Sequence, residues 1–162
     1  MKTNLLILLI TFVSLGASAI EKDKINYVIT NEDTIICKDV SMGFTNAKIT
    51  KTNGEEVKVS KEDVEAYKVN GKLYEKKVVF RNKKATDNRV YMELVGQRNG
   101  LKLYCYKFIA DSGWDISKGN YENAREVATL LVYRDNDLYI EVDKQNAPTI
   151  LDFFHVTDVQ FE

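Results

Sequence analysis

The chain has 162 residues, of which 44% are hydrophobic and 29% are charged, and its formal net charge at pH 7 is −1. This length suits one domain or two very small ones. The near balance of charge gives no electrostatic reason to expect a nucleic acid as a partner. The single histidine excludes a multi-histidine metal site.

The N-terminal segment is typical of a secretory signal peptide. Lys2 precedes the apolar stretch Leu5–Leu15, and small residues end the segment at Ala17 and Ala19. A positive start, an apolar stretch of this length and an A-x-A ending are the three parts of such a signal. The uncharged run is 16 residues long, whereas a membrane-spanning helix needs about 20.

We therefore expect residues 1–19 to be removed by cleavage between Ala19 and Ile20. The mature chain is then exported, as a periplasmic or secreted protein. A bacterial lipoprotein needs a cysteine at the cleavage point, and Ile20 stands there instead. No membrane anchor is expected in the mature chain.

The two cysteines, Cys37 and Cys105, leave two alternatives open. An even number of cysteines in an exported protein permits one disulfide, and closing a loop of about 70 residues would stabilise the fold by roughly 4 kcal/mol. Cysteine is also a common small core residue, so two buried free thiols are the other interpretation. The chain has no C-x-x-C motif, so neither a redox motif nor a zinc knuckle is predicted.

Asn-Gly pairs predict three β-hairpins, at 53–54, 70–71 and 99–100. Each pair lies between short runs with β-branched or aromatic residues, which is the strongest short-range hairpin signal. A fourth turn is expected at 135–137, where the sequence reads Asp-Asn-Asp.

The hydrophobic pattern also predicts the register of two hairpins. In the first, a three-residue turn ending at Gly54 places Ile49 opposite Val57 and Ala47 opposite Val59, which separates apolar from polar residues. Gly54 then takes the left-handed conformation. In the third, a turn over 98–100 gathers an almost continuous apolar face. That face comprises Val90, Met92, Leu94, Tyr104, Tyr106 and Phe108.

The predicted fold class is mainly β, on the borderline of α+β. Residues 20–80 are expected to form an N-terminal β unit, either a small barrel or a curled sheet of hairpins. The polar stretch 81–89 is the expected linker. Residues 90–162 are expected to form a second antiparallel sheet with one C-terminal helix packed on it, and the two units can combine into one domain.

The C-terminal helix is predicted from a helical stripe of apolar residues with start signals before it. Asn146 can cap this helix, and Pro148 is tolerated in its first turn. We expect the stripe to pack on the apolar face of the third hairpin. A short helix is also expected at 120–126. The stripe comprises Ala147, Ile150, Leu151 and Phe154.

Three segments carry a pattern-level resemblance to a known group. They are Tyr91–Phe108, the block 137–140 with its following Phe-rich helix, and the opening 33–40. Together they resemble uncharacterised exported β-rich proteins of Bacteroidota, over about two thirds of the mature chain. The resemblance implies export and a β-rich fold, and it implies no activity.

Enzyme signatures are mostly missing from the sequence. It contains no H-E-x-x-H, no G-x-S-x-G and no Gly-rich phosphate loop. His155 could pair with Cys37 or Cys105 as a dyad only if the fold brings them together. Carboxylates are numerous, but a glycosidase pair must lie about 5–10 Å apart in a cleft. The acids at 135–137 fit a turn better than a calcium loop. We therefore predict no catalytic residue, metal site or cofactor.

Two features point to binding. The chain has nine tyrosines, and aromatic rings on a sheet face can stack on sugars or anchor a protein, although tyrosine is also an ordinary strand residue. The leading hypothesis is a non-enzymatic module that binds a protein or glycan through a β-sheet face. The alternative is a secreted, glycan-directed hydrolase. The second feature is a basic cluster, which lysine protection of a strand edge would also explain; it comprises Lys72, Lys76, Lys77, Arg81, Lys83 and Lys84.

Overall fold

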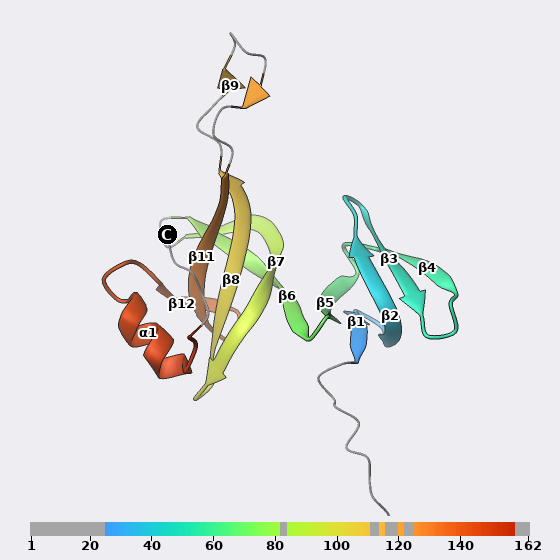
Figure 1. The fold of residues 1–162 in the computed structure, drawn as a ribbon, viewed down its shortest axis with the longest axis horizontal. Coiled ribbons are helices and arrows are strands. Elements are labelled where there is room, and N and C mark those ends of the chain that lie inside the picture. Colours follow the sequence, from blue (N-terminus) through green and yellow to red (C-terminus); the bar gives the residue numbers. More distant parts are fainter. Residues whose placement is uncertain (1–24, 82–83, 111–113, 116–119, 122–124, 158–162) are drawn as a thin grey trace, which may run out of the picture.

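The computed structural model describes residues 25–81, 84–110, 114–115, 120–121 and 125–157. The predicted signal peptide and its cleavage site between Ala19 and Ile20 lie outside these residues. Within them the chain forms one antiparallel sheet of ten strands, a two-stranded ribbon and one helix (Figure 1). The predicted mainly-β fold is therefore confirmed.

The strands follow one another along the chain with short turns between most of them. Their bounds are β1 Asn26–Thr30, β2 Thr34–Met42, β3 Asn46–Lys51, β4 Glu56–Ser60, β5 Val64–Val69, β6 Lys72–Arg81, β7 Lys84–Arg98, β8 Leu101–Ala110, β9 Trp114–Asp115, β10 Asn120–Tyr121, β11 Arg125–Arg134 and β12 Asp137–Glu141. The helix α1 spans Ala147–Phe154.

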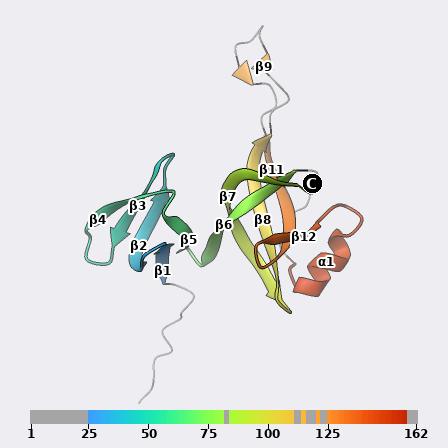
Figure 2. The same ribbon diagram turned by 180° about the vertical axis from the view of Figure 1, so that it is seen from behind.

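The sheet has the order β12-β11-β8-β7-β6-β5-β1-β2-β3-β4, so it is open, with β12 and β4 at its edges, and does not close into a barrel. Figure 1 shows that its strands curl. We call β1–β5 the N-terminal half and β6–β12 with α1 the C-terminal half. The expected second sheet instead continues the first, because the Asn70-Gly71 turn pairs Val69 directly with Lys72. Figure 1 and Figure 2 show the N-terminal half and α1 at opposite ends of the molecule.

Two segments differ from the sequence-based expectation. The polar stretch 81–89, expected to be a linker, belongs largely to the long hairpin of β6 and β7, where Val78 pairs with Arg89 and Phe80 with Ala85. Polar residues suit these strands because residues 84–89 are mostly exposed. The helix expected at 120–126 does not form, since β10 and the start of β11 occupy the described part of that segment.

The hairpin registers agree with prediction. In the first hairpin Ile49 pairs with Val57 and Ala47 with Val59, and Gly54 has a φ of 87°. In the third, Leu94 pairs with Tyr104 as expected. The turn itself has only two residues, and an irregularity between Leu94 and Gly96 supplies the extra residue that restores the predicted register.

The described residues form three hydrophobic clusters that hold the fold together. The N-terminal half has one, which includes Val28, Cys37 and Ile49. The C-terminal half has two, one on each face of its sheet: Cys105 belongs to the cluster under α1, and Met92 to the other. Of the two alternatives for the cysteines, the structure has the free thiols and not the Cys37–Cys105 disulfide, because both cysteines are buried and lie in separate clusters.

The helix α1 packs on the sheet as predicted, but on the opposite face of the third hairpin. Phe154 is buried against the face of Leu103 and Cys105, not against that of Met92 and Tyr104. The Met92–Tyr104 face is already covered from within the sheet, because Phe80 and other side chains of the curled β6–β7 hairpin pack on it.

Asn146 does not cap the helix with its side chain. Its Oδ1 accepts a hydrogen bond from the Asp143 N–H at 2.9 Å, and its Nδ2 donates to the Glu141 carbonyl at 3.1 Å. The strand β12 lies at the edge of the sheet, where backbone groups have no strand partner. The Asn146 side chain therefore forms hydrogen bonds with backbone groups at the end of this edge that no neighbouring strand pairs with.

Candidate functional site

A cleft of about 720 Å³ lies where the two halves of the sheet meet. The β2–β3 turn with the start of β3, and the end of β4 with the turn that follows it, line the cleft on the N-terminal half. Residues of β6 and β7 line its other side. We call it the junction cleft. Its lining residues are Phe44, Thr45, Asn46, Ser60, Lys61 and Glu62 on the N-terminal side, and Lys76, Asp87, Arg89 and Tyr91 on the other.

Phe44 is displayed on the rim of the junction cleft with 96% of its surface exposed. It sits in a tight turn between β2 and β3, in which the Gly43 N–H donates to the Asn46 carbonyl at 2.9 Å. A Cβ at Gly43 would lie 2.8 Å from that carbonyl oxygen, so the turn requires glycine. An aromatic ring held in water on a defined turn is available for a ligand to cover.

Tyr91 forms part of the opposite wall and ties the two halves together. Its hydroxyl lies 3.0 Å from the Lys61 carbonyl oxygen and 2.9 Å from that of Val64, so it donates to acceptors in the N-terminal half. Burial, followed by the charge of Glu65 and by Tyr67, raises the pKa of Tyr91 to about 12. The phenol therefore stays neutral and keeps its proton for this bond.

Tyr91 also belongs to a tyrosine triad on the same sheet face. The ring of Tyr67 stacks on Tyr74 with centroids 4.8 Å apart, and meets Tyr91 edge-on at 5.2 Å. All three residues are half-buried, and burial is the main cause that raises the pKa of Tyr67 to about 12. The triad rings pack on one another, which leaves Phe44 as the more accessible aromatic surface.

The lysines of the basic cluster that belong to β6, which are Lys72, Lys76 and Lys77, are divided between its two faces, while Lys84 begins β7. Edge protection does not explain the cluster, because β6 lies inside the sheet between β5 and β7. Lys76 extends to the junction cleft, where its Nζ donates to the Glu62 carbonyl at 2.5 Å and lies 3.4 Å from Glu65. Lys77 points to the other face, as successive strand residues do. Lys83 lies outside the described residues.

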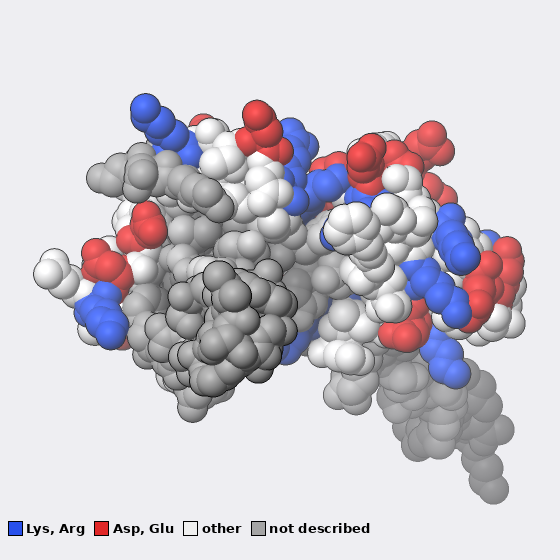
Figure 3. Space-filling view, turned by 90° about the horizontal axis from the view of Figure 1, so that it is seen from above, with Lys and Arg blue, Asp and Glu red and all other residues white. Residues whose placement is uncertain are grey.

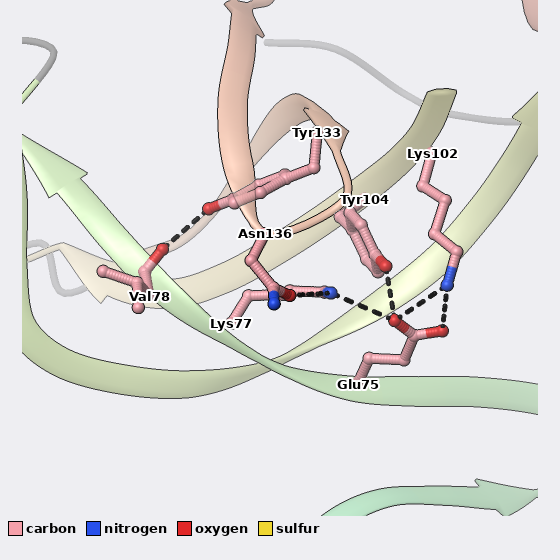
Figure 4. Close-up of polar contacts among 7 residues, drawn as sticks. All are labelled: Glu75, Lys77, Val78, Lys102, Tyr104, Tyr133 and Asn136. Atoms are coloured by element: carbon pink, nitrogen blue, oxygen red, sulfur yellow. Dashed lines mark hydrogen bonds and ion pairs between the residues drawn. The ribbon is translucent and has the colours of Figure 1, made fainter. Parts of the chain in front are cut away.

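On that other face a single carboxylate gathers two lysines and a tyrosine (Figure 4). Glu75 Oε1 and Oε2 accept from Lys102 Nζ at 2.8 and 3.1 Å. Oε2 also accepts from the Tyr104 hydroxyl at 2.5 Å and lies 3.2 Å from Lys77 Nζ. Lys77 in turn donates to Asn136 Oδ1 at 3.3 Å. These five residues are named the Glu75 cluster.

The Glu75 cluster holds the curl of the C-terminal half. It joins β6 and β8 to the β11–β12 turn, and beside it the Tyr133 hydroxyl donates to the Val78 carbonyl at 2.7 Å. Burial acts to raise the pKa of Glu75, but the hydrogen bonds from Lys102 and Tyr104 outweigh it, so the pKa is lowered. A general acid needs the opposite shift. Burial and Glu75 also raise the pKa of Tyr104.

The two cysteines, His155 and the acids at 135–137 are the remaining sequence candidates for chemistry. Burial raises the pKa of both Cys37 and Cys105, which disfavours the thiolate a nucleophile requires. The exposed His155 ring has its Nε2 2.9 Å from Arg98 Nη1. Asp135, with a φ of 55°, forms a hairpin turn with Asn136. Within the described ranges, no three His, Cys, Asp or Glu residues are grouped as metal ligands.

Comparisons with known proteins add no relative to this picture: no family model matches the chain, and neither the curated proteins nor the solved structures contain a match. In the part of the chain that the structure describes, no helix is long and apolar enough to cross a membrane.

Sequence reasoning missed both Phe44 and the Glu75 cluster. A local signal existed for Phe44, because a lone phenylalanine lies between the turn-forming residues Gly43 and Asn46. The Glu75 cluster had no such signal, since its members come from three distant segments and only the curl of the sheet brings them together.

Proposed function

We propose that the chain is an exported, non-enzymatic binding module that takes an oligosaccharide in the junction cleft. The observation that carries the proposal is Phe44, fully exposed on a turn that glycine keeps tight, at the rim of a cleft with polar walls. An exposed aromatic ring offers the apolar face on which the C–H face of a sugar ring packs.

The other residues of the junction cleft supply what sugar hydroxyls require. Arg89 is a planar donor group, Asp87 an acceptor, and Asn46 carries both. The volume of about 720 Å³ lies within the usual range for ligand sites, roughly 300–1,000 Å³. The cleft lining carries both signs of charge, with Lys61, Lys76 and Arg89 beside Glu62 and Asp87, and Figure 3 shows basic and acidic residues interspersed over the face seen from above. This pattern favours a hydroxyl-rich ligand over a highly charged one.

The binding test uses the mature chain, residues 20–162, and isothermal titration against a panel of neutral and acidic oligosaccharides. For any oligosaccharide that binds the parent, we expect Phe44→Ala to weaken binding by about tenfold, which corresponds to about 1.4 kcal/mol. Phe108→Ala is the matched control, because Phe108 is also exposed and lies outside the cleft. Equal losses in both variants, or binding of a protein and of no glycan, would contradict the proposal.

Export is tested separately. Mass spectrometry of the protein recovered outside the cytoplasm of its native host should show Ile20 as the first residue, because the A-x-A ending directs cleavage after Ala19. An intact Met1–Ala19 segment in the membrane fraction would contradict it.

A further inference from the structure

Lys77 is the one charged side chain that is buried among the described residues, with 8% of its surface exposed. Its Nζ lies 5.2 Å from the centre of the Tyr104 ring and contacts Glu75 and Asn136. Glu75 is therefore shared by two ammonium groups, those of Lys77 and Lys102. Two positive charges against one negative charge leave the Glu75 cluster with one net positive charge.

A cavity of about 400 Å³ opens beside these two lysines. Its lining offers hydrogen-bond donors of several kinds, because Asn136 turns its Oδ1 toward Lys77 and so leaves its amide N–H groups free to point elsewhere. Asp135 also lines the cavity and is exposed to solvent. The lining residues are Lys77, Gln97, Gly100, Lys102, Asp135 and Asn136.

A positive charge that is removed from water is costly unless another charge compensates it. Glu75 compensates one of the two lysines, and the exposed Asp135 offsets the other only in part, because solvent screens its charge. An anion in the cavity would meet two ammonium groups and at least one amide donor. Such charge-assisted hydrogen bonds to an ionised oxygen are the stronger kind.

We propose that this cavity binds a small oxyanion, namely a carboxylate or sulfate group, free or carried by a larger ligand. The site lies on the sheet face opposite the junction cleft, because Lys76 and Lys77 are successive residues of one strand and line one site each. It is thus independent of the proposed oligosaccharide site, and either can fail alone.

The test is an NMR titration of ¹⁵N-labelled mature chain with sulfate, acetate and chloride at constant ionic strength. We expect saturable shifts of the Gly100 and Asn136 amide signals with sulfate or acetate and none with chloride. The same titration is repeated with glucuronic acid and with a sulfated monosaccharide. Tighter binding of either sugar than of the matching free ion identifies a substituent of a larger ligand, and equal binding identifies the free oxyanion.

Two variants separate this site from general charge effects. Lys102→Gln should weaken oxyanion binding by about tenfold, whereas Lys107→Gln, which removes the same charge from an exposed ion pair with Glu126, should leave it unchanged. Asp135→Asn should tighten binding several-fold, and asparagine tolerates the φ of 55° at this position. Shifts that do not saturate, equal effects of the two lysine variants, or unchanged binding by Asp135→Asn would each overturn the proposal.

Discussion

The two halves of the sheet bury their hydrophobic residues in different ways. The N-terminal half has one cluster, built from small side chains such as Val28, Ala47 and Val64. The C-terminal half covers both faces of its strands, and its fully buried residues include Tyr104 and Tyr133.

Strand length explains this difference. The strands β6 and β7 have 10 and 15 residues, long enough to curl over the face of β8 and β11, while α1 covers the outer face. The strands of the N-terminal half have between five and nine residues. They curl around one core and use Tyr91, on β7, to close its edge. Among the described residues, no second layer covers the N-terminal half where the junction cleft opens.

The largest expected effect tests the second layer of the C-terminal half. Phe154→Ala removes a ring that is 7% exposed and should lower the free energy of unfolding by about 3–5 kcal/mol. Asp152→Ala, on the exposed side of the same helix, is the control and should change it little. Thermal melts of both variants beside the parent check this. Equal melting temperatures would show that α1 contributes nothing to the stability of this half.

The next effect tests the curl that covers the inner face. Glu75→Gln breaks charged hydrogen bonds and should cost about 1–3 kcal/mol at pH 7. Because the pKa of Glu75 is lowered from its ordinary 4.5, its stabilisation is complete above that value and is lost as the pH falls through the folded-state pKa. The difference in the free energy of unfolding between variant and parent, measured by urea unfolding, should therefore become smaller as the pH is lowered. Glu126→Gln, from an exposed ion pair, serves as control. A gap that widens at low pH would contradict this account.

A smaller effect sharpens the junction between the halves. Tyr91→Phe removes the hydroxyl that reaches the Lys61 and Val64 carbonyls and should cost about 1 kcal/mol. The loss of stability should be greatest in the N-terminal half, so hydrogen exchange should become faster at β5 amides than at β11 amides relative to the parent. Tyr106→Phe, on the inner face of β8, is a suitable comparison. Uniform faster exchange in both halves would mean that the two unfold as one unit.

The smallest expected effect concerns the exposed face of the N-terminal half. Lys48 and Glu56 form an ion pair with an N–O distance of 2.7 Å, but both side chains are more than half exposed. Such surface pairs contribute little, so Lys48→Ala should change the melting temperature by no more than the experimental error. A clear loss of stability would show that charge on this face replaces part of the missing second layer.

The sequence by itself determined the local structure. Alternation of apolar residues and the Asn-Gly turns were enough to predict the pairs Ile49–Val57 and Leu94–Tyr104, because period-two patterning and turn geometry act over a few residues. The stripe ending at Phe154 likewise predicted the helix. Export through the signal at residues 1–19 and the resemblance to exported Bacteroidota proteins stay predictions.

Only the tertiary structure decided which faces are covered and which residues meet. By its sequence pattern alone, the apolar face of Met92 and Tyr104 could be covered by a helix or by a curled hairpin. In the structure the hairpin covers it, because β6 and β7 are long enough to curl over it. The two cysteines fell into separate clusters because four strands of the sheet lie between β2, which carries Cys37, and β8, which carries Cys105. The Glu75 cluster and the junction cleft depend on how far the sheet curls, which is a sum of twist and packing over ten strands that no short stretch of sequence encodes.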